Sequence, residues 1–309
     1  MVHEYGTVTA AAEVLHLTPS AVSHQLRQLA RELDATLLER EGRGVRLTPA
    51  GHRLVAHADT LQAAWEQARA DLAALETGEV GRVRLAAFTS GIIEVLVPVL
   101  DHLAEVAPRL EVELHELERT THGLDRLLAN EIDVALVVAT TDGPRLDDPR
   151  FEQDALLSDP LDLVVALDHP LARHEPVDLA DTAHEPWVLP GRAAWDCYEL
   201  VVSACASAGF SPTVAHRANS TAAIGALVGA GRGVTLLPRL AALGTEDAVV
   251  RVPLVGDPPP RRRVLTCVRR GSAAQPAVAQ ALAALHAVTA DLPVRAPGGA
   301  VPAGGGARP

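Results

Sequence analysis

The stretch TPSAVSHQLRQLARELDATLLER, from Thr18 to Arg40, decides how the amino-terminal part of the chain folds. Thr18 followed by Pro19 is a helix-start signal, because a threonine side chain can cap free backbone N–H groups and proline fits the first helical position. One side carries apolar residues at intervals of four, three and four, which predicts a buried stripe: Val22, Leu26, Leu29 and Leu33. The opposite face is polar, again at helical spacing: Ser20, Ser23, His24, Arg27 and Arg31.

A shorter helical pattern comes before this stretch. Thr9 is a candidate cap for a helix from Ala10 to Leu15, which contains the small pair Ala11–Ala12. Two short helices joined by a tight turn predict a helix-turn-helix, whose second helix enters the major groove of DNA. An ordinary solvated face would show the same polar stripe, but the preceding helix favours DNA contact. After the second helix, LLERE and GVRLT flank a turn at 42–44 and resemble a two-stranded wing.

The polar face suits the chemistry of the major groove. Serine hydroxyls and His24 can donate or accept there, and Arg27 can bind guanine through two hydrogen bonds. A second group lies in the wing and near helix starts, where side chains reach phosphates, which set position and not sequence: Thr18, Arg43, Arg46 and Thr48. The whole chain has a net charge of −12, so any DNA-binding surface must be local.

A long helix is predicted from Pro49 to about Glu76. Its apolar positions alternate at intervals of four and three, which makes a heptad seam: Leu54, Ala58, Leu61, Trp65, Ala68, Leu72 and Leu75. So narrow and regular a stripe indicates self-association, and packing against the chain's own domain is the alternative.

From Gly81 onward, strand and helix patterns alternate, which predicts an α/β fold with largely parallel sheets and, at about 200 residues, two subdomains. The predicted strands are Val83–Phe88, Leu110–His115, Val134–Val138, Leu163–Ala166, Trp187–Leu189, Val214–His216, Gly233–Leu237 and Val264–Val268. The predicted helices are Ile92–Glu105, Gly123–Asn130, Cys197–Ala208, Ala222–Ala230 and Gln275–Thr289.

Composition and motifs exclude several classes of protein. Three cysteines make neither an even disulfide framework nor a paired CxxC metal site, and the thirteen histidines show no ligand pairing. Neither a signal peptide nor an apolar run of about 18 residues occurs, so a soluble cytoplasmic protein is expected. The glycines at 229–233 follow a helix and enter a strand, the reverse of the dinucleotide-binding order. Without GxSxG or HExxH either, we expect no enzyme, no metal and no cofactor.

Several strings, in order along nearly the whole chain, resemble a known family. They are TVTAAAEVLHLTPSAVSHQLRQLARELDATLLER, GRGVRLTPAGH, EIDVALV, DHPLA and LVGAGRGVTLLP. On these residues the chain resembles the LysR-type transcriptional regulators. The resemblance implies an α/β protein with a winged helix-turn-helix, a long linker helix and a periplasmic-binding-protein-like effector domain of two subdomains.

The resemblance also implies domain boundaries and partners. Residues 1–49 would bind DNA, 50–77 would form the linker and dimerisation helix, and 82–292 the effector-binding domain, before a disordered tail at 293–309. Subdomain I would hold 82–160 and 267–290, and subdomain II 161–266, with hinge crossings near 161–163 and 263–266. A dimer or tetramer would bind imperfectly palindromic double-stranded operator DNA, with Gln25 touching the DNA backbone. RNA polymerase would be a further partner, and no membrane is expected.

The effector site is expected at helix starts after strands. Ligands of open α/β sheets bind at the carboxyl ends of strands, where helix N-termini offer free N–H donors. FTSG at 88–91 and NST at 219–221 match, and the resemblance places both in a cleft with the threonines after the 134–138 strand. The candidates are Thr89, Ser90, Thr140, Thr141, Asn219, Ser220 and Thr221, for each of which plain helix capping is the alternative. The donors favour a small anion or polar metabolite, which would act by closing the cleft.

Two alternatives stay open. Family members usually carry further residues before Val2 that complete the first helix, so we expect the true start to lie upstream. A truly short chain would be an effector-binding protein with weak DNA binding, because each lost buried side chain is worth about 1.5–3 kcal/mol. Peroxide-sensing members of the family use two cysteines in about the region of Cys197 and Cys205. On one helix these lie about 12 Å apart, too far for a disulfide without unfolding, which favours buried structural thiols.

Overall fold

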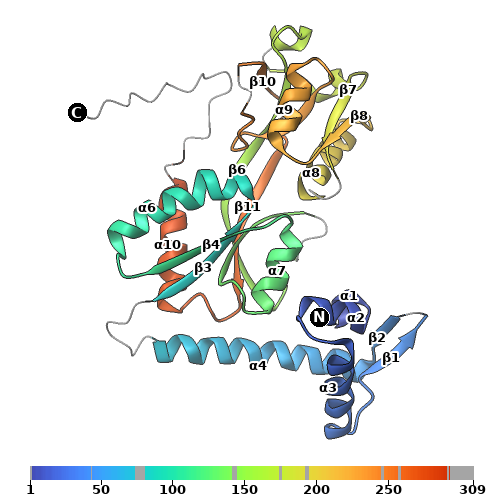
Figure 1. Cartoon of the computed structure of the whole chain (residues 1–309), viewed down its shortest axis with the longest axis vertical. Helices are drawn as coiled ribbons and strands as arrows, with labels where there is room; N and C mark the ends of the chain where they lie inside the picture. The colour runs from blue at the N-terminus through green and yellow to red at the C-terminus, as the bar shows by residue number, and fades with distance from the viewer. Residues whose placement is uncertain are drawn as a thin grey trace.

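The computed structural model describes residues 2–42, 44–73, 81–140, 145–173, 176–191, 195–244, 247–256, 259–290 and 292. Figure 1 shows three parts in chain order: a small helical part with a two-stranded ribbon, one long helix, and an elongated α/β body. The predicted tail at 293–309 lies outside the described residues.

The amino-terminal part is a winged helix-turn-helix. Its helices are α1 (Val2–Tyr5), α2 (Val8–Val14) and α3 (Pro19–Glu32), followed by the antiparallel strands β1 (Leu38–Glu41) and β2 (Gly44–Leu47). The side chains of Ala11, Ala12 and Val22 are buried where α2 meets α3. Thr18 caps α3 by accepting a hydrogen bond from the Ala21 amide (3.2 Å), so this helix start is confirmed.

Two expectations for this part are wrong. The cap of α2 is Thr7 and not Thr9, because the Thr7 hydroxyl accepts from the Ala10 amide and the helix begins at Val8. The predicted stripe of α3 is also only partly buried, since Leu29 and Leu33 are 37% and 48% exposed. With only the four residues of α1 and the seven of α2 above it, α3 is covered at Val22 but not along its second half.

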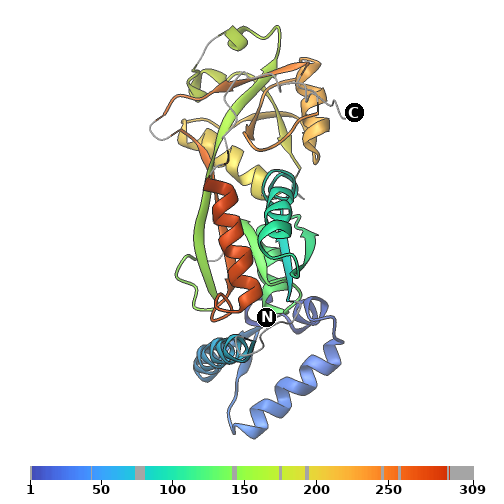
Figure 2. The same cartoon turned by 90° about the vertical axis from the view of Figure 1, so that its left-hand side faces the viewer.

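The long helix α4 (Pro49–Ala73) runs beneath the α/β body, and Figure 2 views it nearly end-on. Thr48 caps it, accepting from the Gly51 amide at 3.1 Å. The predicted continuation to residue 77 falls in the segment 74–80, outside the described residues.

The body is built on one seven-stranded sheet with the order β10-β6-β11-β5-β3-β4, and β9 joins at β6. The strands are β3 (Arg82–Ala87), β4 (Glu111–Glu116), β5 (Val134–Val138), β6 (Phe151–Ala166), β9 (Thr235–Pro238), β10 (Val249–Pro253) and β11 (Arg261–Arg269). A separate parallel pair consists of β7 (Pro186–Pro190) and β8 (Thr213–Ala218).

The expectation of largely parallel sheets is wrong. Within the large sheet only the pairs β3–β4 and β3–β5 are parallel, whereas β6 and β11 are antiparallel to all their neighbours. The reason is that β6 carries the chain into the second subdomain and β11 carries it back. The sequence prediction also missed β10 and residues 151–162 of β6.

Subdomain I therefore comprises 82–160 and 261–290, and subdomain II comprises 161–260. Pro160 still pairs with Arg261 in the first sheet region, while Leu161 pairs with Pro238 in the second. The strand pairing thus changes partner at 160–161 and at 260–261, and the crossings expected near 161–163 and 263–266 stay predictions. Pairing of β11 with β5 continues from Val264 to Val268, which fixes that segment in subdomain I.

Helices cover both faces of each subdomain. In subdomain I, α6 (Val97–Val106) and α10 (Pro276–Ala290) pack on one face, and α7 (Thr120–Leu128) packs on the other. The short turns α5 (Thr89–Gly91) and η1 (Ile92–Leu96) lead into α6. Subdomain II carries η2 (Pro170–Arg173), η3 (Leu179–Thr182), α8 (Trp195–Ser207) and α9 (Thr221–Gly229). Its two buried clusters are mainly aliphatic, as the low aromatic content predicts.

Candidate functional site

The polar face of α3 points away from the rest of the molecule. In Figure 1, α3 projects from the lower end with the β1–β2 wing beside it. Ser20, His24, Gln25, Arg27 and Arg31 are all exposed, and Ser23 is half-buried. Since Val22 packs inward, the helix presents its hydrogen-bonding side chains to solvent as one surface. The geometry fits a helix that enters a major groove.

The wing supplies fewer free cations than its sequence indicates. Arg46 is paired with Glu39 (2.8 Å) and lies 3.8 Å from Glu41, so the carboxylates offset its charge. Arg43 lies outside the described residues. Thr48 is buried, and its hydroxyl donates to the Thr36 carbonyl (2.6 Å) besides capping α4. Thr48 thus stabilises the start of α4. The predicted contact of Thr48 with a DNA phosphate stays a prediction.

The predicted seam of α4 lies on its uncovered side. Leu61, Trp65 and Leu72 are 71%, 63% and 65% exposed, and Ala58 and Ala68 are exposed as well. Leu54 is half-buried, and Leu75 lies outside the described residues.

The other side of α4 packs against the chain's own α/β body. Glu66 and Ala70, which are 1% and 2% exposed, lie on that side. The helix therefore divides its surface: one side is already buried within the chain, and the seam is left bare.

The predicted effector residues of the first loop meet a buried arginine. Arg262, 2% exposed, donates to the Ser90 hydroxyl (3.1 Å) and stacks over the Phe88 ring at 4.4 Å. It also forms an ion pair of 2.6 Å with Asp159, its cross-strand neighbour where β6 and β11 pass between the subdomains. Thr89 donates its hydroxyl to Glu116. Sequence reasoning missed the Arg262–Asp159 pair, because only the strand register brings these residues together.

The remaining predicted effector residues differ in their surroundings. Ser220 caps α9 by accepting from the Ala223 amide (3.2 Å), and Asn219 and Thr221 flank it. The Thr140 hydroxyl is buried and has no hydrogen-bond partner among the described residues. Thr141 lies outside the described residues.

One contact crosses from subdomain II to subdomain I at the start of α7. The Thr120 backbone amide, a free N–H of a helix N-terminus, donates to the Asp196 carboxylate of α8 at 2.6 Å. The Thr120 hydroxyl accepts from the Val138 amide (3.0 Å), which ties the same point to the end of β5. The sequence prediction began this helix at Gly123 and so missed Thr120, and no sequence signal identifies Asp196 as its partner.

The cysteines are not arranged as a reactive pair. Burial raises the pKa of Cys205 to about 12, and it raises the pKa of Cys197 despite the opposing effect of Arg262. Cys267 is fully buried in subdomain I, where burial raises its pKa as well. Each thiol is thereby kept in its less reactive protonated form, which agrees with structural cysteines.

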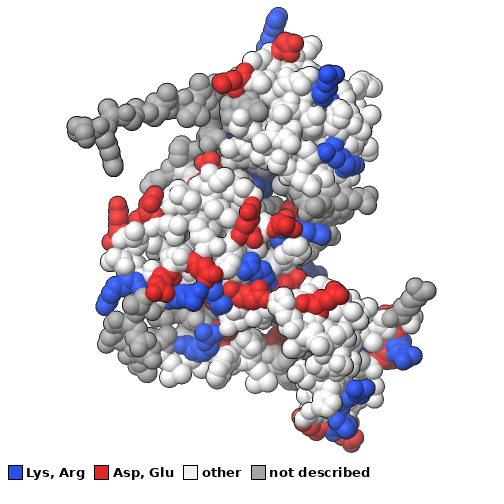
Figure 3. All heavy atoms as spheres, in the orientation of Figure 1, with Lys and Arg blue, Asp and Glu red and all other residues white. Residues whose placement is uncertain are grey.

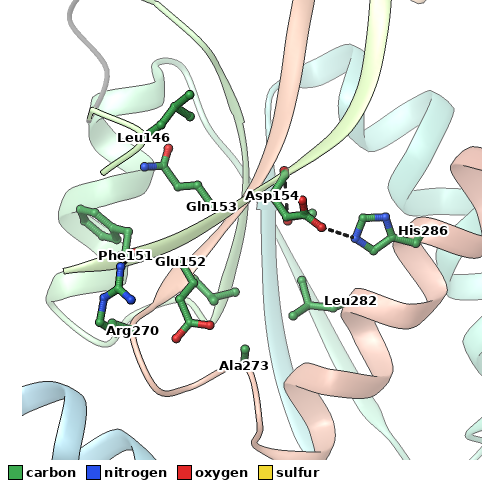
Figure 4. Close-up of a pocket in the computed structure, with 11 residues that line it drawn as sticks. Leu146, Phe151, Glu152, Gln153, Asp154, Arg270, Ala273, Leu282 and His286 are labelled. Carbon is green, nitrogen blue, oxygen red and sulfur yellow. Dashed lines mark hydrogen bonds and ion pairs between the residues drawn. The ribbon is translucent and has the colours of Figure 1, made fainter. Parts of the chain in front are cut away.

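A cavity of about 450 Å³ lies in subdomain I, lined mainly by residues of β6, β11 and α10. Figure 4 shows its wall, where His286 of α10 points toward Asp154 of β6 at 3.4 Å. Its other polar groups bond within the chain: Gln153 donates to the Arg145 carbonyl (2.9 Å), and Glu152 accepts from the Gly271 amide (2.6 Å). None of the predicted site residues lines it.

Two kinds of site are absent from the part of the chain that the structure describes. It holds no cluster of three or more metal-ligating side chains. It also has no helix that is both long and apolar enough to cross a membrane.

Comparison with known proteins agrees with this architecture. Residues 1–52 match the bacterial regulatory helix-turn-helix protein, lysR family, and residues 76–290 match the LysR substrate binding domain. The transcriptional dual regulator GltC of Bacillus subtilis is 31% identical over 237 residues, covering 76% of this chain and 77% of GltC. A probable hydrogen peroxide-inducible genes activator of Streptomyces viridosporus is 31% identical over 298 residues, covering 92% and 90%.

Solved structures share the fold. Full-length CbnR in complex with its target DNA superposes with a TM-score of 0.56 at 24% identity, covering 93% of this chain and 96% of CbnR. A cysteine mutant of OxyR from Corynebacterium glutamicum gives 0.61 at 23% identity, covering 94% and 89%. The family matches span most of the sequence, and both similar relatives are regulators of transcription. The chain is a member of the LysR family of bacterial transcriptional regulators.

Proposed function

We propose that this regulator binds a specific operator sequence through α3 and responds to a small-molecule effector in the cleft between its subdomains. The main observation in favour of DNA binding is the exposed polar face of α3, opposite buried Val22. In Figure 3, arginine side chains reach the surface at the α3 and wing end, with acidic side chains among them.

Self-association would provide two such helices. The bare seam around Leu61, Trp65 and Leu72 supports a dimer or tetramer, since each monomer reads half of a site. The CbnR relative was solved with its target DNA, and DNA binding by this chain is inferred with that support. A DNA-binding regulator of this kind acts in the cytoplasm, and RNA polymerase is the further partner that such a role implies.

The effector is inferred to be a small anion or polar metabolite. Buried Arg262, the Ser90 hydroxyl and the unpartnered Thr140 hydroxyl supply donors at the carboxyl ends of the strands. Because Asp159 already offsets the charge of Arg262, its contribution is a hydrogen-bond donor, the Nε–H that has no partner among the described residues.

Footprinting tests the DNA-binding part. The full chain is footprinted on DNA flanking its own gene, with wild type, Arg27→Ala, Arg43→Ala and the control Arg173→Ala in subdomain II. Arg27→Ala is expected to weaken the specific site by about 1–3 kcal/mol, or roughly 5- to 150-fold, and to relax its sequence preference. Arg43→Ala should weaken all sites alike and lower the salt dependence by about one phosphate contact.

The control Arg173→Ala removes the same charge from an exposed turn of subdomain II and should leave binding unchanged. A footprint unaffected by Arg27→Ala would overturn the assignment of the α3 face. The effector part is tested by repeating the footprint with candidate carboxylates and phosphates, using Ser90→Ala to identify cleft-dependent changes.

A cysteine-based peroxide response is the second candidate, motivated by the peroxide-responsive relative of Streptomyces viridosporus. The raised thiol pKa values and the burial of Cys205 oppose it. Peroxide treatment should therefore leave three titratable thiols and the footprint unchanged, and a loss of two thiols with a changed footprint would favour redox sensing.

A further inference from the structure

Helix α7 touches three parts of the molecule that are far apart in sequence. Figure 1 shows it between α8 of subdomain II and the α1–α2 region. Its first amide holds the Asp196 carboxylate of subdomain II at 2.6 Å. Its nine residues span only about 13 Å, so contacts at its two ends are joined by one short rigid rod.

The middle of α7 contacts the DNA-binding part directly. The Tyr5 hydroxyl of α1 donates to the Asp125 carboxylate, and His16, after α2, lies 3.5 Å from Glu131, just beyond the end of α7. Burial raises the pKa of Tyr5, an effect that the bond to Asp125 reinforces, so this hydroxyl stays a donor. This hydrogen bond joins α1 of the DNA-binding part to α7 of the effector domain.

The far end of α7 is held by a buried charge cluster. Arg269 donates to the Leu127 carbonyl (3.0 Å) and to the Ile132 carbonyl (2.6 Å). The same guanidinium forms an ion pair with Glu66 of α4 at 3.1 Å, and both side chains are 2% exposed. Glu66 also accepts from Gln275 (2.8 Å). Arg269 therefore contacts both the last turn of α7 and the linker helix α4.

Close backbone contact reinforces this junction. Gly271, with φ +85°, lies so near α4 that a Cβ there would stand 2.5 Å from the Ala63 carbonyl oxygen. No side chain fits between the chain after β11 and the linker helix. The interface between α4 and subdomain I is thus both ion-paired and closely packed, so a movement of one side displaces the other.

We propose that α7 transmits the open or closed state of the cleft to the DNA-binding part. The Asp196–Thr120 hydrogen bond passes a change in the cleft to α7. The Tyr5–Asp125 and Arg269–Glu66 contacts pass it on to α1 and α4. The inference rests on the proposed function, because it takes the cleft as the place where the effector binds. One face of α7 is packed on the sheet through Thr120, Gly123, Leu124 and Leu127. The helix consequently shifts as a unit when a cleft ligand displaces or strengthens the Asp196 contact.

The same connection must act in both directions, because coupling between two sites is reciprocal. Hydrogen–deuterium exchange of the full chain tests this without DNA or effector, so its outcome is independent of the footprinting. In Asp196→Ala, amides of α7 and of α4 around Glu66 should exchange about fivefold faster or more, the lower end of ordinary coupling. In Tyr5→Phe, which removes one hydroxyl, the first turns of α7 and α8 should exchange faster by a similar factor.

The matched control is Asp181→Ala, which removes an exposed carboxylate of η3 in the same subdomain. It should leave α4 and α7 at wild-type exchange rates. The proposal is overturned if Asp196→Ala changes only α8 and the first turn of α7, or if Tyr5→Phe changes only α1. Either result would leave the footprinting prediction standing, just as a missing footprint would leave this coupling measurable.

Discussion

Removing the Arg269 guanidinium should destabilise the protein more than removal of any surface charge. Arg269 is 2% exposed and makes four different contacts: with Glu66, with Asp133 (3.2 Å) and with the carbonyls of Leu127 and Ile132. Arg269→Met keeps an unbranched apolar stem of similar shape but leaves two buried carboxylates and two carbonyls without this donor.

The magnitude follows from what is left behind. Breaking a buried ion pair by removing one partner costs about 3–5 kcal/mol, because the other charge stays buried without compensation. Here Asp133 keeps Arg84 (2.8 Å), and Glu66 keeps Gln275 and Arg69, so the lower half of that range is expected. For a domain of about 200 residues, about 3–4 kcal/mol corresponds to a fall in Tm of roughly 6–16 °C.

Thermal unfolding followed by circular dichroism measures the effect, with Glu105→Gln as the control. Glu105 is an exposed residue of α6, and its substitution should stay within about 0.5 kcal/mol. The double variant Glu66→Leu with Arg269→Met removes the stranded carboxylate and should recover about 1–3 kcal/mol relative to additivity. A loss below about 1 kcal/mol for Arg269→Met, or strict additivity in the double variant, would refute a buried, coupled pair.

Three further predictions concern other parts of the chain. Trp65→Glu should convert the oligomer to monomers in analytical ultracentrifugation, whereas His57→Glu, on α4 but outside the seam, should not. The pKa of Asp133 is lowered because hydrogen bonds from Arg84 outweigh the raising effect of burial. Its contribution to stability is therefore complete above the ordinary aspartate pKa of 3.8 and should be lost as pH falls through the lower folded value, measurable as acid unfolding. Thr7→Ala should cost about 1 kcal/mol in urea unfolding, while Thr9→Ala should change little.

Local signals in the sequence predicted the DNA-binding part well. The cap at Thr18, the turn at 42–44 and the heptad seam depend on neighbours a few residues away, and the structure has the corresponding helices and wing. The error at Thr7 has a tertiary cause. Gly6 adopts φ +65° and its carbonyl accepts from the Val45 amide (2.9 Å), so the wing holds residue 6 out of the helix and α2 starts directly after Thr7.

The charged pairs of the effector domain could not be predicted. Glu66 stands in a helix rich in polar residues and resembles a solvated position, yet it is buried by an arginine 203 positions later in the chain. Arg262 and Asp159 are neighbours only because β6 and β11 run antiparallel in one particular register. Apolar strands buried on both faces have the same sequence pattern in parallel and antiparallel sheets. The sequence therefore predicts neither the direction of these strands nor their register.

The energies of these contacts indicate which of them an effector can change. Effector coupling is typically about 1–3 kcal/mol, less than the roughly 3–5 kcal/mol needed to break a buried ion pair. The Arg269–Glu66 contact should therefore be loosened but not broken, so that a movement of the last turn of α7 reaches α4. The contacts that can give way are the single hydrogen bonds, Asp196–Thr120 and Tyr5–Asp125. Because Trp65 of the seam lies next to Glu66 on the same helix, we propose that a rotation of subdomain I also turns the seam, which would link the cleft to the spacing of two α3 helices on DNA.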